Sequence, residues 1–501
     1  MNVYVACPSG AVTGGIELLH QLTCELNKHQ DVNAYIWYFS PADVPIPEAY
    51  KKYKNPYIEI EKPQNGILIF PEVYVSYANL PKYKDYKKVI YWESVDNYFR
   101  WIPEDQLYKF PDNVIHMYQS VYALNFLIKK VKATNVLKLT DYLNDDYLSL
   151  NNTTNERNDW VLYNPSKGMF FTKEIIDRLP DVEFKPIQGM TTQQIIELMQ
   201  KSKLYIDFGD HPGKDRIPRE AAMCGCCVIT GRNGSANFWG DIPIDDAYKF
   251  DRNEEYLSAI SSKILHVLNH YNEHKHDFDD YRKIIKREKE QFQEGVTELV
   301  NTIRPRFSII IPAHNSANYI IKALSSVKSQ TFKDYELIVV CDNCFDNTEQ
   351  IAKQYGATTK RVMFGCDGPT RNKGIEMATG EYVLFMDDDD WWLHEYVLDQ
   401  LDKKLKELGD ADILCFSFIF KGLRYAEPSG NGGNHWNACW CKCYRRDKIG
   451  SSRFSNVKAW SDVDFYNSIM NKGLKIYDWD MPMYYYNYMR KGSQSEQYTN
   501  G

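Results

Sequence analysis

The sequence predicts an α/β protein in which short apolar strands alternate with helices. The chain of 501 residues is too long for one hydrophobic core, so we expect about three domains. The alternation of strand, loop and helical pattern is typical of parallel sheets, whose crossover connections are helices. Three segments begin in this way: MNVYVAC at 1–7, DWVLYNP at 159–165 and RFSIIIPA at 306–313.

Changes of pattern along the chain predict the domain boundaries. We expect a first Rossmann-type domain over residues 1–155 and a second over 156–265. Residues 266–304 are rich in charge, carry apolar residues at roughly helical spacing and end just before Pro305, which predicts a helical connector. Residues 305–501 then form the C-terminal domain. Because no internal repeat is visible, the two halves are separate domains and not copies of one unit.

Composition excludes some classes of function. Lys and Arg total 60 against 67 Asp and Glu, a formal net charge of −7 that gives no electrostatic signature of a nucleic-acid-binding protein. The N-terminus lacks a signal-peptide pattern, and no later run approaches the roughly 18 apolar residues of a membrane span. We therefore expect a cytoplasmic protein with no transmembrane segment, in which the 12 cysteines are reduced.

The C-terminal domain begins with the strand FSIIIP, and polar residues follow its predicted strands. The next strand, ELIVV, leads to Asp342. Ligands bind outside the carboxyl ends of strands in open α/β sheets, so Asp342, Pro312 and the residues after it, including Asn315, are placed to contact a nucleotide. A predicted helix carrying Arg371 then leads to a third strand. These residues are expected at one edge of the sheet.

The third strand ends in an unusual acidic run, VLFMDDDDWW at residues 383–392. Adjacent carboxylates repel one another, which is tolerable where a divalent cation neutralises them, and oxygen ligands suit Mg²⁺ or Mn²⁺ that also grips a diphosphate. One alternative is an acidic helix start, which the helix macrodipole favours. Another is a haloacid dehalogenase-type phosphatase, but such an enzyme has Thr or Val where this chain has Trp391.

Four motifs in order resemble a family 2 glycosyltransferase domain of GT-A fold over residues 305 to 490. They are IIIPAHNSANYI with SVKSQTF, VVCDNCFDNT, TRNKGIEMATGEYVLFMDDDD, and WSDVDF. The resemblance implies that Asp342 holds the nucleobase and that Asp462 is the general base. It also implies that Asp387 and Asp389 form a DxD motif that binds the sugar nucleotide and the metal.

Arg371 and Asp388 join the donor-binding residues in this interpretation. Sugar transfer requires neutralisation of the departing diphosphate and removal of the acceptor's proton, and displacement from the far face inverts the anomeric centre. A helix cap is the alternative for Asp462, because SDVDF looks like a helix start. One departure from the family is Cys341, which with Cys344 forms a CxxC that can also be interpreted as a redox pair or half a zinc site.

Two features of the N-terminal half suggest a second donor site. The loop PSGAVTGG, ending at Gly15, precedes a helix whose N-terminal amides can face a phosphate or a sugar. A tight turn that packs helix on strand is the alternative. The strand KLYIDFG leads to a loop with Lys214 and Arg216, and Glu220 begins a helix. Cations beside a helix N-terminus can hold a diphosphate, and a carboxylate there can bind ribose hydroxyls.

The segment REAAMCG resembles the EAxxxG segment of the carboxy-terminal half of GT-B glycosyltransferases, and the likeness covers roughly residues 1 to 265. It implies that Glu220 contacts the donor ribose, as a member of a second catalytic site, and that Lys214 or Arg216 contacts the diphosphate. Retaining enzymes of the related family carry another Glu eight residues earlier, where this chain has Pro212. The stereochemistry of this half therefore stays open.

The whole sequence predicts a bifunctional glycosyltransferase, a GT-B-like pair followed by a GT-A domain. We expect nucleotide-sugar donors, a UDP-sugar foremost, and a glycan or lipid-linked glycan acceptor of a surface polysaccharide such as capsule or lipopolysaccharide. Peripheral association with the inner face of the membrane fits this role. One alternative is a single active GT-A domain with a non-catalytic N-terminal acceptor-binding scaffold. A second alternative is a nucleotidyltransferase, but such an enzyme has a glycine-rich loop with a cation, and the segment AHNSANYI lacks both. A third is a carbohydrate-binding protein that hydrolyses no donor.

Overall fold

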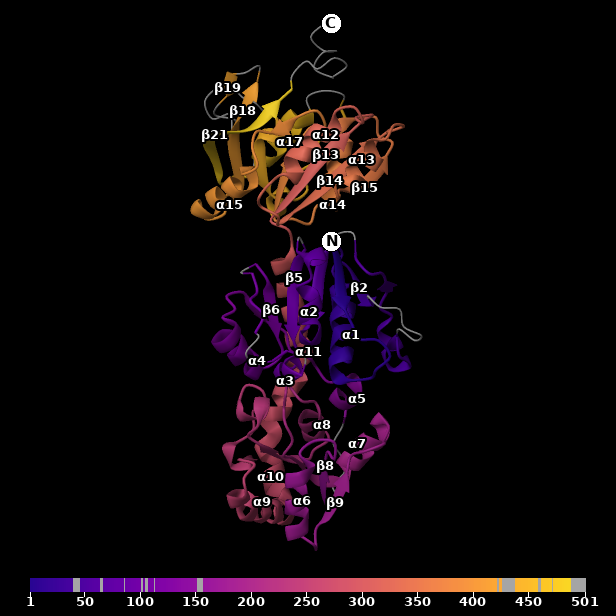
Figure 1. Ribbon diagram of the computed structural model, residues 1–501, viewed down its shortest axis with the longest axis vertical. Coiled ribbons are helices and arrows are strands. Elements are labelled where there is room, and N and C mark those ends of the chain that lie inside the picture. Colours follow the sequence, from indigo (N-terminus) through magenta and orange to yellow (C-terminus); the bar gives the residue numbers. More distant parts are fainter. Residues whose placement is uncertain are drawn as a thin grey trace. The chain divides into compact units, whose positions relative to one another are not determined.

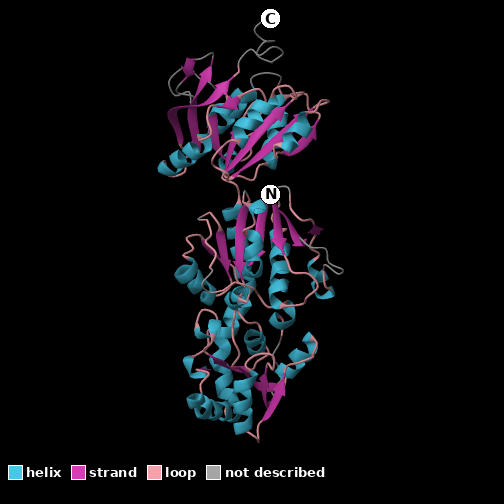
Figure 2. Cartoon of the chain, in the orientation of Figure 1, coloured by secondary structure: helices cyan, strands magenta, loops and turns pink. Residues whose placement is uncertain are grey.

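The computed structural model consists of two compact units, Asn2–Thr302 and Ile303–Gly501 (Figure 1). Strands of each sheet lie side by side with helices packed on them (Figure 2). The structure describes residues 1–38, 46–63, 66–84, 86–100, 102–103, 107–111, 113–150, 156–420, 423–425, 438–457, 461–470 and 472–487.

The first sheet of the N-terminal unit has seven parallel strands in the order β3-β2-β1-β4-β5-β6-β7. Buried apolar strand residues such as Leu68, Ile90 and Trp92 form its core. The strands are β1 Asn2–Ala6, β2 Asn33–Tyr38, β3 Tyr57–Glu59, β4 Ile67–Pro71, β5 Lys87–Trp92, β6 Ile115–Tyr118 and β7 Val136–Lys138. The α-helices are α1 Gly14–Leu26, α2 Val75–Ala78, α3 Val95–Phe99, α4 Val121–Phe126 and α5 Asp145–Leu148.

The second sheet of this unit has five parallel strands in the order β12-β11-β10-β8-β9. Strand β11 lies between β12 and β10 and is fully buried. The strands are β8 Asn158–Tyr163, β9 Glu183–Pro186, β10 Ser202–Asp207, β11 Cys227–Gly231 and β12 Lys249–Phe250. The helices are α6 Met169–Arg178, α7 Thr192–Gln200, α8 Ile217–Met223, α9 Leu257–Asn269 and α10 Tyr271–His274.

The long helix α11 Asp279–Ile303 occupies most of the stretch expected as a connector, and it packs against both sheets of the N-terminal unit (Figure 1). Near its start, Tyr281 and Ile285 belong to the core of the second sheet. Farther along, the Phe292 ring lies 5.2 Å from that of Tyr142, which follows the first sheet. The charged face seen in the sequence is therefore only the outer side of a helix built into the unit.

The C-terminal unit contains a mixed sheet of nine strands in the order β15-β14-β13-β16-β20-β18-β21-β17, with β19 beside β18. Strands β15 to β16 in this order are parallel, whereas β20 runs antiparallel to β16. The strands are β13 Phe307–Ala313, β14 Tyr335–Asp342, β15 Thr358–Val362, β16 Tyr382–Phe385, β17 Trp391–Trp392, β18 Ile413–Phe420, β19 Leu423–Tyr425, β20 Lys442–Arg445 and β21 Ile476–Tyr486. The helices are α12 Ile320–Lys328, α13 Thr348–Gln354, α14 Asp367–Met377, α15 Val397–Glu407, α16 Arg446–Ile449 and α17 Ser461–Met470.

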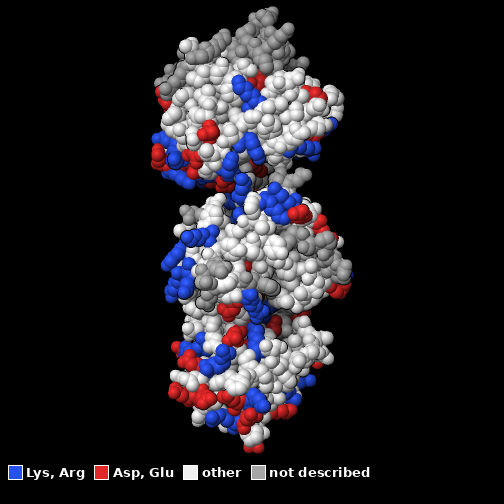
Figure 3. Space-filling view, viewed as in Figure 1, with Lys and Arg blue, Asp and Glu red and all other residues white. Residues whose placement is uncertain are grey.

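Surface charge is mixed in both units. Figure 3 shows acidic and basic side chains interspersed over the visible face of each, in keeping with the net charge of −7. None of the described helices combines the length and the apolar composition that a membrane crossing requires.

Candidate functional site

The predicted residues of the C-terminal unit gather where three parallel strands end. Strand β13 lies between β14 and β16, with Pro312 opposite Val340 in the register. Asn315, in the loop after β13, has a φ of +49°, and its side-chain oxygen accepts a hydrogen bond from the amide of Phe345 at 2.9 Å. It thus ties the loop after β13 to the loop after β14.

Asp342, at the end of β14, is buried and fully occupied by hydrogen bonds from the protein itself. Its carboxylate accepts bonds from the amides of Phe364, Gly365 and Cys366 at 2.7, 3.1 and 3.0 Å, and from the Thr370 hydroxyl at 3.0 Å. The resemblance assigns Asp342 to the nucleobase. In this structure it shapes the loop between β15 and α14, the rim of the same site.

Arg371 contacts two carboxylates with different predicted roles. The sequence assigns Asp387 to the donor and the metal, and Asp462 to the role of general base. On α14, and buried, it donates from Nη2 to Oδ1 of Asp387 at 2.7 Å, while Nη1 lies 3.5 Å from Oδ1 of Asp462. Asp462 lies in the first turn of α17, as the helix-start pattern predicts, and its Oδ2 accepts a bond from the Cys439 amide at 3.1 Å. Residues 91 positions apart in the sequence therefore share one site.

The electrostatics of Asp387 reflect an excess of negative charge. Burial, together with the neighbouring carboxylates Asp462 and Asp389, raises its pKa to about 6 against the opposing effect of Arg371. Such a site favours an additional positive charge.

Two members of the acidic run anchor it to the fold. The Asp388 carboxylate accepts bonds from the Ser316 hydroxyl and from the His314 amide at 3.2 Å, and burial raises its pKa to about 8. Asp390 is fully buried and accepts bonds from the Tyr484 hydroxyl at 2.7 Å and from the amide of Asn487 at 2.8 Å. The Asp388 side chain, predicted to bind donor, is thus turned toward the loop after β13.

The CxxC forms no disulfide. Cys341 and Cys344 are buried free thiols, and a hydrogen bond with Cys341 lowers the pKa of Cys344 to about 7. Within the described ranges, neither thiol belongs to a group of three side chains close enough to share a metal ion.

In the N-terminal unit the Gly14–Gly15 pair begins α1, after Thr13, which caps the helix by accepting from the amide of Ile16. A Cβ atom on Gly15 would overlap Oε2 of Glu93, which follows β5. One added to Gly14 would lie 3.2 Å from Cδ of Arg216. Side chains from both sheets therefore approach this turn closely.

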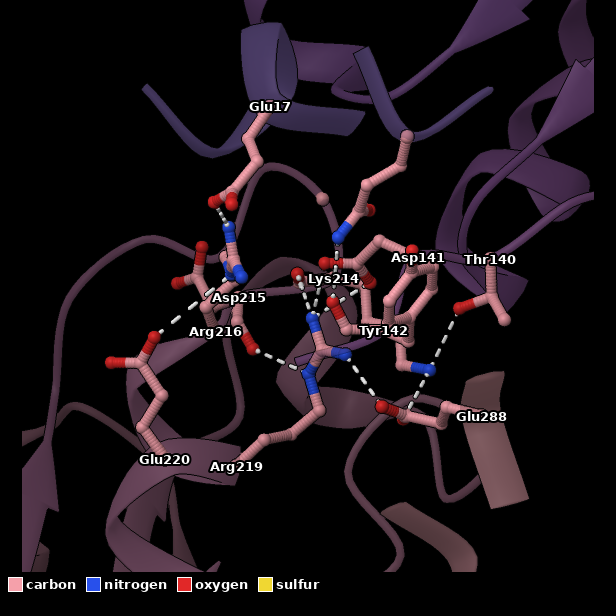
Figure 4. A network of polar contacts seen from close by, with 12 residues as sticks. Glu17, Thr140, Asp141, Tyr142, Lys214, Asp215, Arg216, Arg219, Glu220 and Glu288 are labelled. Carbon is pink, nitrogen blue, oxygen red and sulfur yellow. Dashed lines mark hydrogen bonds and ion pairs between the residues drawn. The ribbon is translucent and has the colours of Figure 1, made fainter. Parts of the chain in front are cut away.

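The cations predicted to bind diphosphate are paired with carboxylates (Figure 4). Lys214 donates to Oγ1 of Thr140 at 2.8 Å and to Oε1 of Glu288 at 2.6 Å. Arg216 forms an ion pair with Glu17, on α1, and its Nε lies 3.9 Å from Glu220. Burial raises the pKa of Glu220, although Arg216 opposes this. Glu220 lies in α8, three positions after the helix begins.

Arg219 is the centre of this network (Figure 4). Fully buried, it donates to both oxygens of Asp141 at 2.7 and 2.8 Å and to Oε2 of Glu288 at 2.7 Å. Burial acts to raise the pKa of Asp141, but Arg219 and Lys214 outweigh it and hold that pKa at about 2. The network joins the first sheet's end, the β10–α8 loop and α11.

A second polar cluster lies beside the same loop. Potential ligand atoms of Asp207, His211 and Asp215 all lie within 4.8 Å of one another. Nδ1 of His211 is 2.8 Å from Oδ2 of Asp215, and the Lys167 ammonium is also 2.8 Å from that oxygen. Burial acts to lower the pKa of His211, but Asp215 and Asp207 raise it. Because Lys167 already supplies a cation, we assign no metal ion to this cluster.

Sequence reasoning missed several residues of these sites: Glu93, Glu288, Ser316 and Tyr484. Glu93 follows the apolar run VIYW, and a carboxylate after an apolar run is the signal that identified Asp342. Glu288 was hidden in a charged helix, where a buried carboxylate looks like any other.

Comparisons with known proteins agree with this geometry in the C-terminal unit. The model of glycosyl transferase family 2 matches residues 308–450. Glycosyltransferase GlyA of Streptococcus pneumoniae is 35% identical over 226 residues, which cover 39% of this chain and 32% of that protein. The GalNAc(5)-diNAcBac-PP-undecaprenol beta-1,3-glucosyltransferase of Campylobacter jejuni is 37% identical over 136 residues, covering 26% of this chain and 43% of that protein.

A solved structure, sucrose-phosphate synthase of Thermosynechococcus elongatus, is similar with a TM-score of 0.42 and 11% identity, covering 60% of this chain and 98% of that one. The chain spans about a third of the length of GlyA. Residues 308–450, which contain Asp342, Arg371 and the acidic run, are thus the part of the chain that is similar to glycosyl transferase family 2.

Proposed function

We propose that this chain is a bifunctional glycosyltransferase that transfers sugars from nucleoside diphosphate sugars to a growing surface glycan. The C-terminal GT-A domain is one catalytic site, and the N-terminal unit, a GT-B-like pair of α/β domains, is the other. The observation that carries the proposal is the meeting of Asp387, Arg371 and Asp462 in the unit that matches family 2. The name of the Campylobacter relative includes an undecaprenol diphosphate-linked glycan, which supports a lipid-linked glycan as acceptor.

A divalent cation, Mn²⁺ or Mg²⁺, fits the C-terminal site. Carboxylate oxygens are the ligands that these ions prefer, and the excess of negative charge that raises the pKa of Asp387 suits a cation. Asp387 and Asp389 would hold the ion. When bound, it would supply positive charge for the departing diphosphate.

Residues of the chain orient the reacting groups and accept the proton. Arg371 lies between the donor side and the acceptor side and orients both Asp387 and Asp462. Asp462, held by the Cys439 amide, takes the proton of the acceptor hydroxyl. The acceptor oxygen bonds to the anomeric carbon as the bond from that carbon to the diphosphate breaks, with inversion. Asp342 maintains the loop that borders the nucleotide.

Two parallel sheets in one unit support the GT-B-like assignment, as does the approach of the α1 loop to the β10–α8 loop. Glu220 and Arg216 lie where a donor would meet both. A specific observation favours the alternative, a non-catalytic acceptor-binding scaffold: Lys214 and Arg219 are already paired with Glu288. Arg216 is itself paired with Glu17, so donor binding at this site must displace a carboxylate from Arg216 or from Lys214.

The test uses the full chain with UDP- and GDP-sugars, Mn²⁺ and a lipid-linked glycan acceptor, with products analysed by mass. Asp389→Asn should abolish one sugar addition and its metal requirement, whereas Glu220→Ala should abolish the other. Full transfer in excess chelator overturns the metal assignment. Survival of every product in the combined Glu220→Ala and Lys214→Ala variant leaves one active site and favours the scaffold.

A further inference from the structure

Glu93 places a carboxylate with one unpaired oxygen against the first turn of α1. The residue follows β5, and a Cβ atom added to Gly15 would lie 2.3 Å from its Oε2. Among the described residues, Oε1 of Glu93 is buried and has no hydrogen-bond partner. Buried carboxylate oxygens are almost always paired in proteins, so an orphan one indicates a partner that the protein does not supply.

The backbone around Glu93 also meets the loop between β10 and α8. The Val95 amide donates to the Pro212 carbonyl at 3.0 Å, and Ser94 forms an isolated bridge with Gly213. A Cβ atom on Gly213 would overlap the Glu93 carbonyl oxygen. Three loops that follow parallel strands, β1, β5 and β10, therefore converge at one residue. Ligands of open α/β sheets bind at such carboxyl ends.

The charged and titratable groups around Glu93 are mostly acidic. Buried Glu72, after β4, accepts a hydrogen bond from the Glu93 amide at 3.1 Å, and Asp141 approaches from the end of the first sheet. Cys7 and Tyr91 face it as neutral groups. The nearby cations Arg216 and Lys214 are paired with Glu17 and Glu288.

Burial, followed by the charges of Glu72 and Asp141, raises the pKa of Glu93 well above its ordinary range. A carboxylate that is buried beside like charges lowers the stability of the fold. Such carboxylates cluster at functional sites, where a reaction uses them.

We propose that Glu93 is the acid–base residue of the N-terminal site, accepting the proton of a sugar hydroxyl on the acceptor. This inference rests on the proposed function of the N-terminal unit as a second transferase. The acceptor oxygen bonds to the donor's anomeric carbon, the bond from that carbon to the diphosphate breaks, and the hydroxyl proton passes to the Glu93 carboxylate. A base of this kind gives inversion at the anomeric carbon.

The proposed role of Glu93 and a purely structural role, as an anion that stabilises the start of α1, predict opposite changes in Tm when Glu93 is neutralised. Because the folded-state pKa is raised, the ionised carboxylate destabilises the fold increasingly as pH rises from the ordinary Glu range toward the raised pKa. The isosteric Glu93→Gln should then raise Tm, and more so at pH 8 than at pH 5. If Glu93 were a helix-stabilising anion, its neutralisation should instead lower Tm.

The experiment uses the full chain with Asp389→Asn as parent, so that remaining transfer reports the N-terminal site. Glu93→Gln should lower kcat by about 10² to 10⁴ with the donor KM unchanged, and should remove the acidic limb of the pH profile. Glu93→Asp should retain partial activity. Glu48→Gln is the matched control, because Glu48 is 85% exposed on the same unit and should change nothing.

The outcomes separate the two hypotheses. If the parent neither transfers nor hydrolyses any UDP- or GDP-sugar, the second transferase site fails and the role of Glu93 fails with it. If the parent is active and Glu93→Gln keeps its rate and pH profile, only the role of Glu93 is overturned. A lower Tm in Glu93→Gln at pH 8 also contradicts the proposal, whereas the combination of lost rate and raised Tm supports it.

Discussion

Replacing Arg219 by Met should destabilise the N-terminal unit severely, because it removes the cation of a fully buried network. Arg219 is 0% exposed and contacts Asp141 and Glu288, each at 2.7 Å. Breaking a buried ion pair from one side costs about 3–5 kcal/mol, because the remaining charge is left unpaired in a medium of low polarity. Lys214 still faces Glu288 at 2.6 Å, so Asp141 is the carboxylate that loses its hydrogen-bonded cation, and the loss should stay within this range.

The loss should appear as a shift in urea midpoint. With a slope of about 3 kcal/mol per molar for a unit of this size, the midpoint should fall by roughly 1 to 1.7 M. Hydrogen exchange of peptides from residues 2–302 in rising urea measures it, and peptides from 303–501 serve as an internal reference. The matched control is Arg287→Met on α11, whose pair with Glu290 is exposed and should contribute less than about 1 kcal/mol.

A double-mutant cycle tests the reasoning directly. Asp141→Asn together with Arg219→Met removes both charges and should be more stable than Arg219→Met alone, with a coupling of about 2 kcal/mol. A loss below about 1 kcal/mol in Arg219→Met, or strictly additive effects in the cycle, refutes the view that this network stabilises the unit through charge pairing.

Three further predictions concern the C-terminal unit. Asp462→Asn should lower kcat by about 10² to 10⁴ while the donor KM is kept, and an unchanged turnover under saturating donor would assign the base elsewhere. Because the pKa of Asp387 is raised to about 6, Mn²⁺ affinity measured by calorimetry should fall as pH drops from 7 to 5; equal affinities at both ends contradict this. Tyr484→Phe removes a hydrogen bond to buried Asp390 and should cost about 1–3 kcal/mol in thermal unfolding, while Tyr485→Phe, the adjacent control, should have a smaller effect.

The strands and the edge that carries the C-terminal site could be predicted because their signals are local. An apolar run followed by a polar residue identified β13, β14 and β16, and parallel pairing of these strands brings their ends together. The orientation of adjacent side chains could not be predicted. In the acidic run, Asp388 turns to Ser316 and Asp390 to Tyr484, and both partners lie far away in the sequence.

The ion-pair network of the N-terminal unit could not be predicted from local sequence patterns either. Arg219 lies 78 residues from Asp141 and 69 from Glu288, so its pairing depends on the packing of α11. Lys214 and Arg216 lie between a strand and a helix, and Glu220 lies in the first turn of that helix, as the sequence predicts. A cation near a helix start looks the same in the sequence whether its partner is a diphosphate or a carboxylate. Tertiary contacts decide between these partners.

The way α11 is built into both sheets determines where the chain can be divided. A fragment that stops at residue 265, the end of the predicted second domain, would lose Glu288 and leave Lys214 and Arg219 without this counter-charge. It would also uncover the apolar surface that Phe292 and Tyr281 now cover. A fragment that ends at Thr302 retains these contacts. The exchange or recombination of such modules between related chains should therefore succeed after α11 and fail before it.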